Sequence, residues 1–174
     1  MRFQFVEPAE DFSDGLKVLY SYHEQFLKRG RELLDLVDRI QSDGMTEEHA
    51  YQCVHLHCYY QRANPLHHQD EERVLFPLIV HRSFLVDGMI ERLALDHQEI
   101  EEAWDELARI IGCPEQIADR EKLKQRVLAF EKLQRQHVTR ENEDFFPAIE
   151  EWLSPEQRTE TGKEMASMRV LRRS

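Results

Sequence analysis

Apolar residues recur at alternating steps of three and four along several long stretches of this chain. That spacing keeps apolar side chains on one face of an α-helix and is typical of helices packed lengthwise in a bundle. Only six glycines and six prolines occur in 174 residues, which favours long helices over many short strands and turns. The fullest series are Leu16, Leu19, His23, Phe26, Gly30, Leu33, Val37 and Ile40, and Val86, Ile90, Leu93, His97, Ile100, Trp104, Leu107 and Ile111.

These series predict an all-α fold, a four-helix bundle with a short fifth helix. We expect helices over residues 13–40, 46–81, 86–111, from 119 into the 140s, and from about 155 to 171. Four long helices with short connections imply that neighbouring helices run antiparallel. We expect a single domain over residues 1–174, with an N-terminal arm over 1–11, the bundle over about 12–153 and a C-terminal helix over about 155–171.

Individual residues indicate where these helices begin and break. Ser13, Thr46 and Ser154 carry side-chain oxygens that can cap a helix N-terminus, and Pro155 suits the first turn. Proline lacks a backbone donor and crowds the previous turn, so Asn64-Pro65 is expected to interrupt the second helix.

The charge and cysteine content exclude several classes of function. The net charge of −11 argues against nucleic-acid binding, and we interpret the one basic stretch, residues 169–173, as a solvated helix end. No apolar run is long enough for a signal peptide or for crossing a membrane. Cys53, Cys58 and Cys113 are odd in number and form no CxxC motif. We therefore expect reduced thiols, a cytoplasmic location and no membrane partner.

One segment of the second helix is repeated in the fourth. The sequence HHQDEERVLFP begins at His67 and HVTRENEDFFP begins at His137, so His, Glu, Phe and Pro recur at the same offsets. Each copy is preceded by a helix with a single histidine in its apolar series, His23 before the first copy and His97 before the second. The chain therefore contains two helical hairpins with the same pattern of polar residues.

This pattern suits a metal centre inside the bundle. Residues four apart lie on one helix face, so Glu71 can lie beside His67, and Glu141 beside His137. Four imidazoles and two carboxylates without thiolates suit iron, and less decisively manganese or zinc, with the carboxylates as natural bridges between two cations. A single core histidine is more often a satisfied structural residue. Four buried together would lack partners, so we favour a metal centre over a metal-free bundle.

The repeat also chooses between two registers in the second helix. His68 and Glu72 are four apart as well, but their counterparts in the fourth helix are Val138 and Asn142. The repeat therefore favours His67 and Glu71 as ligands and places His68 on a neighbouring face or beside the metal as an additional residue. We expect the remaining histidines to be surface or supporting residues: His49, His55, His57 and His81.

Together these residues resemble the hemerythrin/HHE cation-binding family over about residues 12–170. The residues that carry the resemblance are His23, His67, Glu71, Phe76-Pro77, His97, His137, Glu141, Phe146-Pro147 and the Leu153-Ser154-Pro155-Glu156 start of the last helix. The resemblance implies an up-and-down four-helix bundle. It also implies a cofactor of two iron ions bridged by carboxylates and by an oxo or hydroxo group.

One position departs from the oxygen-carrying hemerythrins, which place a further histidine one turn after the third-helix ligand. Here that position is Glu101. Two octahedral irons offer about 12 positions, and four histidines, two bridging carboxylates and one oxygen bridge fill about 10 of them. The site is therefore either more open than an oxygen carrier's or partly closed by Glu101. The alternative for Glu101 is a solvated side chain.

We expect the protein to bind or sense a small diatomic ligand, O2 or NO, or to handle iron and peroxide. The alternatives are a redox enzyme that reduces peroxide or nitric oxide, and an interaction module whose metal is structural. The set of four histidines and two glutamates is also similar to that of the di-iron proteins implicated in iron–sulfur cluster repair. Those proteins carry an additional N-terminal cysteine-bearing domain that is not found in this sequence. No nucleophile–base pair or phosphate-binding loop is evident, so an organic substrate is not expected, and a homodimer is left open.

Overall fold

The computed structural model describes residues 3–171, and it confirms the all-α bundle with an added C-terminal helix. No strand occurs in that part of the chain. The elements in chain order are α1 (Gly15–Asp43), α2 (Glu47–Gln69), η1 (Asp70–Leu75), α3 (Phe76–Ile79), α4 (Phe84–Ile111), η2 (Pro114–Gln116), α5 (Arg120–Arg140), η3 (Glu141–Phe145), α6 (Phe146–Ile149), η4 (Glu150–Trp152) and α7 (Pro155–Leu171).

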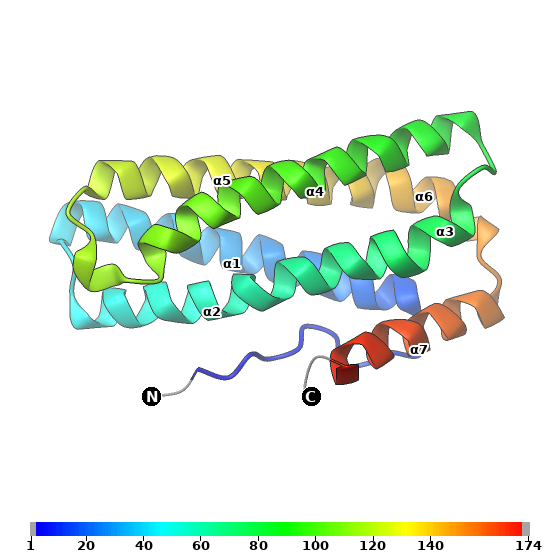
Figure 1. The fold of residues 1–174 in the computed structure, drawn as a ribbon, viewed down its shortest axis with the longest axis horizontal. Helices are drawn as coiled ribbons and strands as arrows, with labels where there is room; N and C mark the ends of the chain where they lie inside the picture. The colour runs from blue at the N-terminus through cyan, green and yellow to red at the C-terminus, as the bar shows by residue number, and fades with distance from the viewer. Residues whose placement is uncertain (1–2, 172–174) are drawn as a thin grey trace.

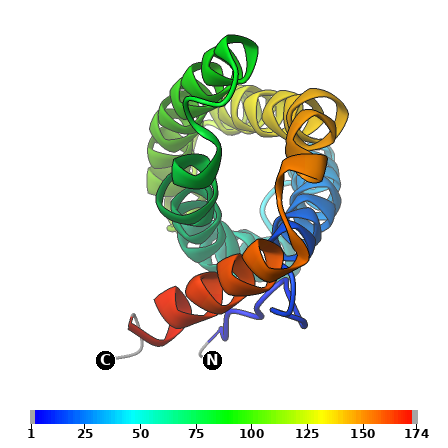
Figure 2. The same cartoon turned by 90° about the vertical axis from the view of Figure 1, so that its right-hand side faces the viewer.

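The long helical segments run side by side along the length of the molecule (Figure 1). Viewed from the end they form a ring, in which α1 packs against α2 and α5, and α4 packs against α2 and α5 (Figure 2). Helix α7 crosses the outside of this ring and packs against α1 and η1, on the side where the N-terminal arm lies. Across residues 3–171, the helices are either too short or too polar to cross a bilayer.

The apolar series identified in the sequence form the core. Every residue of the series in α1 and α4 is buried except Ile90, which is half-buried. Each fully buried Leu, Ile, Val or Phe side chain contributes about 1.5–3 kcal/mol to folding. The histidines in these series therefore lie at the same depth as leucines and isoleucines, in the dry interior of the bundle.

Two of the three predicted helix caps are confirmed, and one is wrong. Thr46 accepts a hydrogen bond from the His49 backbone N–H at 3.1 Å, and Ser154 accepts one from Gln157 at 3.1 Å. Helix α1 is capped by Asp14, whose Oδ1 accepts from the Leu16 N–H at 2.9 Å, and not by Ser13. The side chain of Ser13 is used elsewhere, since its hydroxyl donates to Asp11.

The expected interruption at Asn64-Pro65 is also wrong, because α2 continues through Pro65 to Gln69. Pro65 leaves the carbonyl of residue 61 without its helical donor, and this residue is exposed, so water can satisfy it. The α-helical hydrogen-bond pattern is interrupted instead at two later segments, the π-helical η1 and η3. There the Phe76 N–H bonds to the Glu71 carbonyl, and the Phe146 N–H to the Glu141 carbonyl, five residues back.

The interpretation of the basic C-terminal stretch as solvated is wrong for Arg169, which is only 7% exposed. Its guanidinium donates to both carboxylate oxygens of Asp70, at 2.5 and 2.6 Å, and lies over the rings of Tyr22 and Phe12. This bidentate ion pair connects α7 to η1, at the residue directly before Glu71. The other arginines of the stretch, Arg172 and Arg173, lie outside the described residues.

We predict that Arg169→Met lowers the free energy of unfolding by about 3–5 kcal/mol, because it leaves Asp70 as an unpaired buried charge. Chemical denaturation of the purified protein measures the change. The control is Arg135→Met, which removes an exposed ion pair with Glu131 and is expected to cost about 1 kcal/mol or less. Equal effects of the two substitutions would mean that the Arg169–Asp70 pair has no special structural role.

Candidate metal centre

The six residues that the repeat singles out come together at one level of the bundle. Each exposes at most 1% of its surface. They come from all four long segments: His23 from α1, His67 and Glu71 from α2 and η1, His97 from α4, and His137 and Glu141 from α5 and η3. Their side-chain donor atoms form two overlapping groups, each able to hold a metal ion: His23, His67, Glu71 and Glu141, and His97, His137, Glu71 and Glu141.

We call these groups the α1–α2 position, which contains His23 and His67, and the α4–α5 position, which contains His97 and His137. Glu71 belongs to both. Its Oε1 lies 3.6 Å from Nε2 of His67, while its Oε2 lies 2.9 Å from Nε2 of His97. The two oxygens of one carboxylate thus face opposite positions, as a carboxylate that bridges two cations must.

Glu141 is also shared, but through a single oxygen. Its Oε2 lies 2.9 Å from Nε2 of His23 at one position and 3.1 Å from Nε2 of His137 at the other. The two carboxylates therefore lie between the two pairs of imidazoles. Each comes from a π-helical segment, a form of helix found often at functional sites.

Oxygen atoms outside the centre orient the histidine rings. His97 donates from Nδ1 to Glu72 at 2.7 Å, and His23 donates from Nδ1 to the side-chain oxygen of Asn142 at 2.6 Å. With the proton on Nδ1, each Nε2 turns its lone pair toward the centre, the arrangement found in metal-ligating histidines. Glu72 and Asn142 occupy equivalent places in the sequence repeat, so each copy orients the histidine of the other hairpin.

The repeated phenylalanines act in the same crossed manner. Phe76 stacks on the ring of His97, with centroids 6.2 Å apart, and Phe146 stacks on His23 at 5.3 Å. His67 is packed differently, against Tyr22 at 5.6 Å, and its Nδ1 has no hydrogen-bond partner among the described residues. The aromatic rings shield the centre from bulk water.

The ring of His137 lies against a buried carboxylate that the sequence did not single out. Its Nδ1 is 3.4 Å from Asp96, which also accepts from Arg92 and Arg140. Burial alone would raise the pKa of Asp96, but the hydrogen bonds from His137, Arg140 and Arg92 lower it to about 2. Burial likewise opposes protonation of His137, yet the Glu141 and Asp96 carboxylates raise its pKa to about 9.

The further candidates from the sequence are placed as follows. His68 is buried beside the α4–α5 position, with a ring nitrogen within 4.8 Å of those of His97 and His137, in a third group that contains neither carboxylate. Glu101 belongs to neither group: its carboxylate is 55% exposed and accepts from Nδ1 of His68 at 3.0 Å. The other histidines lie outside the centre. His49 is buried and bonds to the Gly44 carbonyl, His55 and His57 are half-buried, and His81 is exposed.

Sequence reasoning missed Asp96 and Asn142. Asn142 could have been found, because it is the counterpart of Glu72 in the repeat and follows Glu141 directly. Asp96 has no counterpart, and only its position before His97 distinguishes it from other acidic residues.

The donor set fits a pair of cations. Both oxygens of Glu141, Oε1 of Glu71 and Nε2 of His137 make no well-aligned hydrogen bond within residues 3–171, although Oε2 of Glu141 and Nε2 of His137 lie 3.1 Å apart. Each such buried polar atom costs about 1–3 kcal/mol. Burial and the neighbouring Glu141 raise the pKa of Glu71 well above its ordinary value, since two carboxylates in a dry core oppose each other's ionisation. Positive ions between the carboxylates and the imidazole lone pairs would satisfy all of these groups.

Comparisons with known proteins agree with this geometry. A family model described as the hemerythrin HHE cation binding domain matches residues 14–149, a span that includes all six residues. A curated protein from Haemophilus influenzae, described only as an uncharacterized protein, is 27% identical over 175 residues, covering 97% of this chain and 99% of that protein. No solved structure matches the chain significantly.

We predict that Glu71→Gln stabilises the protein once metal has been removed with a chelator. The raised pKa means that the wild-type Glu71 carboxyl supports the fold below its unfolded pKa and loses that contribution as pH rises through the folded pKa. The variant should therefore unfold at nearly the wild-type free energy near pH 4.5. At pH 8 we expect it to be more stable by about 1–4 kcal/mol.

Glu102→Gln is the matched control for this comparison, because Glu102 is exposed on α4. Its effect should stay within about 0.5 kcal/mol at both pH values. A metal-free Glu71→Gln protein that is less stable than wild type at pH 8 would show that the two carboxylates do not oppose each other.

Proposed function

Since the chain belongs to the hemerythrin HHE cation-binding domain family, we propose that its buried centre holds two iron ions and serves to bind or sense a small diatomic ligand, O2 or NO, or to handle iron and peroxide. The observation that carries this proposal is the sharing of Glu71 and Glu141 between two groups of imidazoles. A single cation would be coordinated by only one of the two pairs of imidazoles and would leave the other pair without a metal. Nitrogen and oxygen donors without thiolates favour iron, with manganese or zinc as the alternatives.

Iron held there would supply one-electron redox chemistry and coordination sites for a small ligand. The chain's own residues supply binding and orientation. Asn142, Glu72 and Asp96 hold imidazole rings with Nε2 directed inward, and Glu71 and Glu141 provide the negative charge. The surrounding aromatic rings and the burial of every donor exclude bulk water, which favours small ligands over organic substrates.

The proposal also covers the cellular compartment and the oligomeric state of the protein. Cys53, Cys58 and Cys113 are all free thiols, which suits a reducing compartment, and we propose the cytoplasm. One chain contributes both positions of the centre, so a homodimer is not required for metal binding.

We predict about two irons per chain after expression in iron-replete medium, measured by elemental analysis. His67→Ala removes an imidazole from the α1–α2 position and should reduce iron affinity by at least about 10- to 100-fold. His81→Ala is the control, because His81 is exposed and outside the centre, and it should retain wild-type iron. One zinc per chain, or no metal at all, would exclude the iron pair.

The ligand-binding role has its own test, an ultraviolet–visible spectrum of the iron-loaded protein. We expect a charge-transfer band that appears with O2 or NO and disappears reversibly when the gas is removed. Consumption of peroxide or NO over many turnovers would instead support the redox enzyme. A spectrum that does not change with O2, NO or peroxide would indicate that the metal has a structural role.

A further inference from the structure

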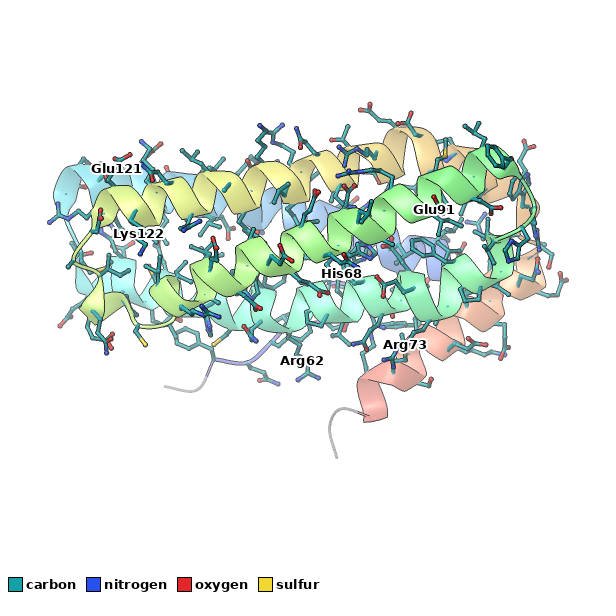
Figure 3. All side chains as sticks on the ribbon, turned by 45° about the horizontal axis from the view of Figure 1, so that its top comes forward. Arg62, His68, Arg73, Glu91, Glu121 and Lys122 are labelled. Atoms are coloured by element: carbon teal, nitrogen blue, oxygen red, sulfur yellow. The ribbon has the colours of Figure 1, made fainter. Side chains whose placement is uncertain are left out.

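His68 is a buried polar side chain that the six-residue centre does not use. It lies in α2 directly after His67 and is 2% exposed. Figure 3 shows it midway along the bundle, where α2 and α4 pack against each other, whereas the labelled charged residues such as Glu121 and Lys122 project from the surface. Its Nε2 has no hydrogen-bond partner among the described residues, so a purely structural role leaves half of its ring unsatisfied.

The ring of His68 is fixed at the α4–α5 position. It stacks on His97 with centroids 4.0 Å apart and planes 14° apart, and it lies edge-on to His137 at 6.1 Å. Its donor nitrogen belongs to a third metal-competent group, formed by His68, His97 and His137. This group shares His97 and His137 with the α4–α5 position and contains neither carboxylate, so three imidazoles lie close together there and two at the α1–α2 position.

The hydrogen bonding of His68 suits a metal ligand. Its Nδ1 lies 3.0 Å from Oε1 of Glu101, and a carboxylate oxygen accepts, so Nδ1 carries a proton. The buried Nε2, which has no partner among the described residues, is the nitrogen left for a metal. His23 and His97 likewise have an outer oxygen at Nδ1, and their Nε2 atoms face the carboxylates of Glu141 and Glu71, each at 2.9 Å.

We infer that His68 is a fifth imidazole donor of the centre, binding the metal at the α4–α5 position together with His97 and His137, and that Glu101 orients it. This inference rests on the proposed iron pair. It assigns Glu101 a positioning role, in place of the partial closure of the site that its position one turn after His97 had suggested. It also supplies the additional histidine from α2 and not from α4.

A fifth donor makes the two positions unequal. The counterpart of His68 in the repeat is Val138, which is buried at 1% exposure and cannot ligate. With five histidines, about 11 of the roughly 12 octahedral positions are filled. The remaining one falls at the α1–α2 position, beside His23 and His67. A small ligand should therefore bind to one iron only.

The test counts the sites open to azide, a small anion that gives a charge-transfer band on ferric iron. Iron content of the wild-type protein is measured first, so that failure of the iron pair is recognised separately. Wild-type protein should then bind about one azide per chain, and His68→Gly about two, by the same position count. Free imidazole should restore the wild-type value in the variant by filling the vacated volume.

His57→Gly is the matched control, because it places the same helix-weakening glycine on α2 outside the centre and should behave as wild type. A His68→Gly protein that keeps two irons, binds one azide and ignores imidazole would overturn the inference. Loss of iron that imidazole restores would support it, and loss from a folded variant that imidazole does not restore would count against it.

A measurement on the wild-type protein decides the matter if His68→Gly does not fold. Mössbauer spectroscopy of the azide-free diferric protein should show two quadrupole doublets of equal area, one for each donor set. A single narrow doublet would mean that the two irons have indistinguishable surroundings and would count against a fifth imidazole at one of them.

Discussion

The rest of the structure depends on the burial of two carboxylates, Glu71 and Glu141, at full depth in an apolar bundle. Carboxylates in such surroundings are stable only when neutralised, and the groups nearest to them are imidazole nitrogens whose lone pairs face the same space. Positive ions resolve this conflict, and a scaffold that keeps all of these atoms in place without them must be held from outside. Asn142, Glu72 and Asp96 provide that support, and the Arg169–Asp70 pair ties the adjoining π-helical segment to α7.

Residues of each hairpin hold the first-helix histidine of the other hairpin in place, and these contacts account for most of the sequence repeat. Each copy supplies a carboxylate shared by both positions, an oxygen that orients the other hairpin's histidine, and a phenylalanine that stacks on it. Where both members of a repeated pair are buried, a polar residue replaces an apolar one only at His68 and Val138. That difference adds an imidazole to one position only. An otherwise symmetrical scaffold thereby acquires two unequal sides, which is what a centre that receives a ligand at one metal requires.

Helix periodicity and the repeat were enough to predict the bundle and the convergence of six polar residues, because both depend on spacing along single helices. The features that were missed depend on contacts between helices. Asp96 is recognisable only once α4 faces α5, and Arg169 only once α7 reaches η1. Pro65 and Ser13 show a different limit. The residue whose carbonyl loses its helical donor to Pro65 is exposed, so α2 continues through the proline, and Asp14 caps α1 in place of Ser13.

The most direct test of a two-metal centre is anomalous diffraction from crystals of the iron-loaded protein, with data collected on both sides of the iron absorption edge. A two-metal centre should give two peaks per chain, about 3.5–4 Å apart, lying between Glu71 and Glu141. One peak would lie beside His23 and His67, and the other beside His97 and His137. A single peak, or iron located away from these carboxylates, would contradict such a centre.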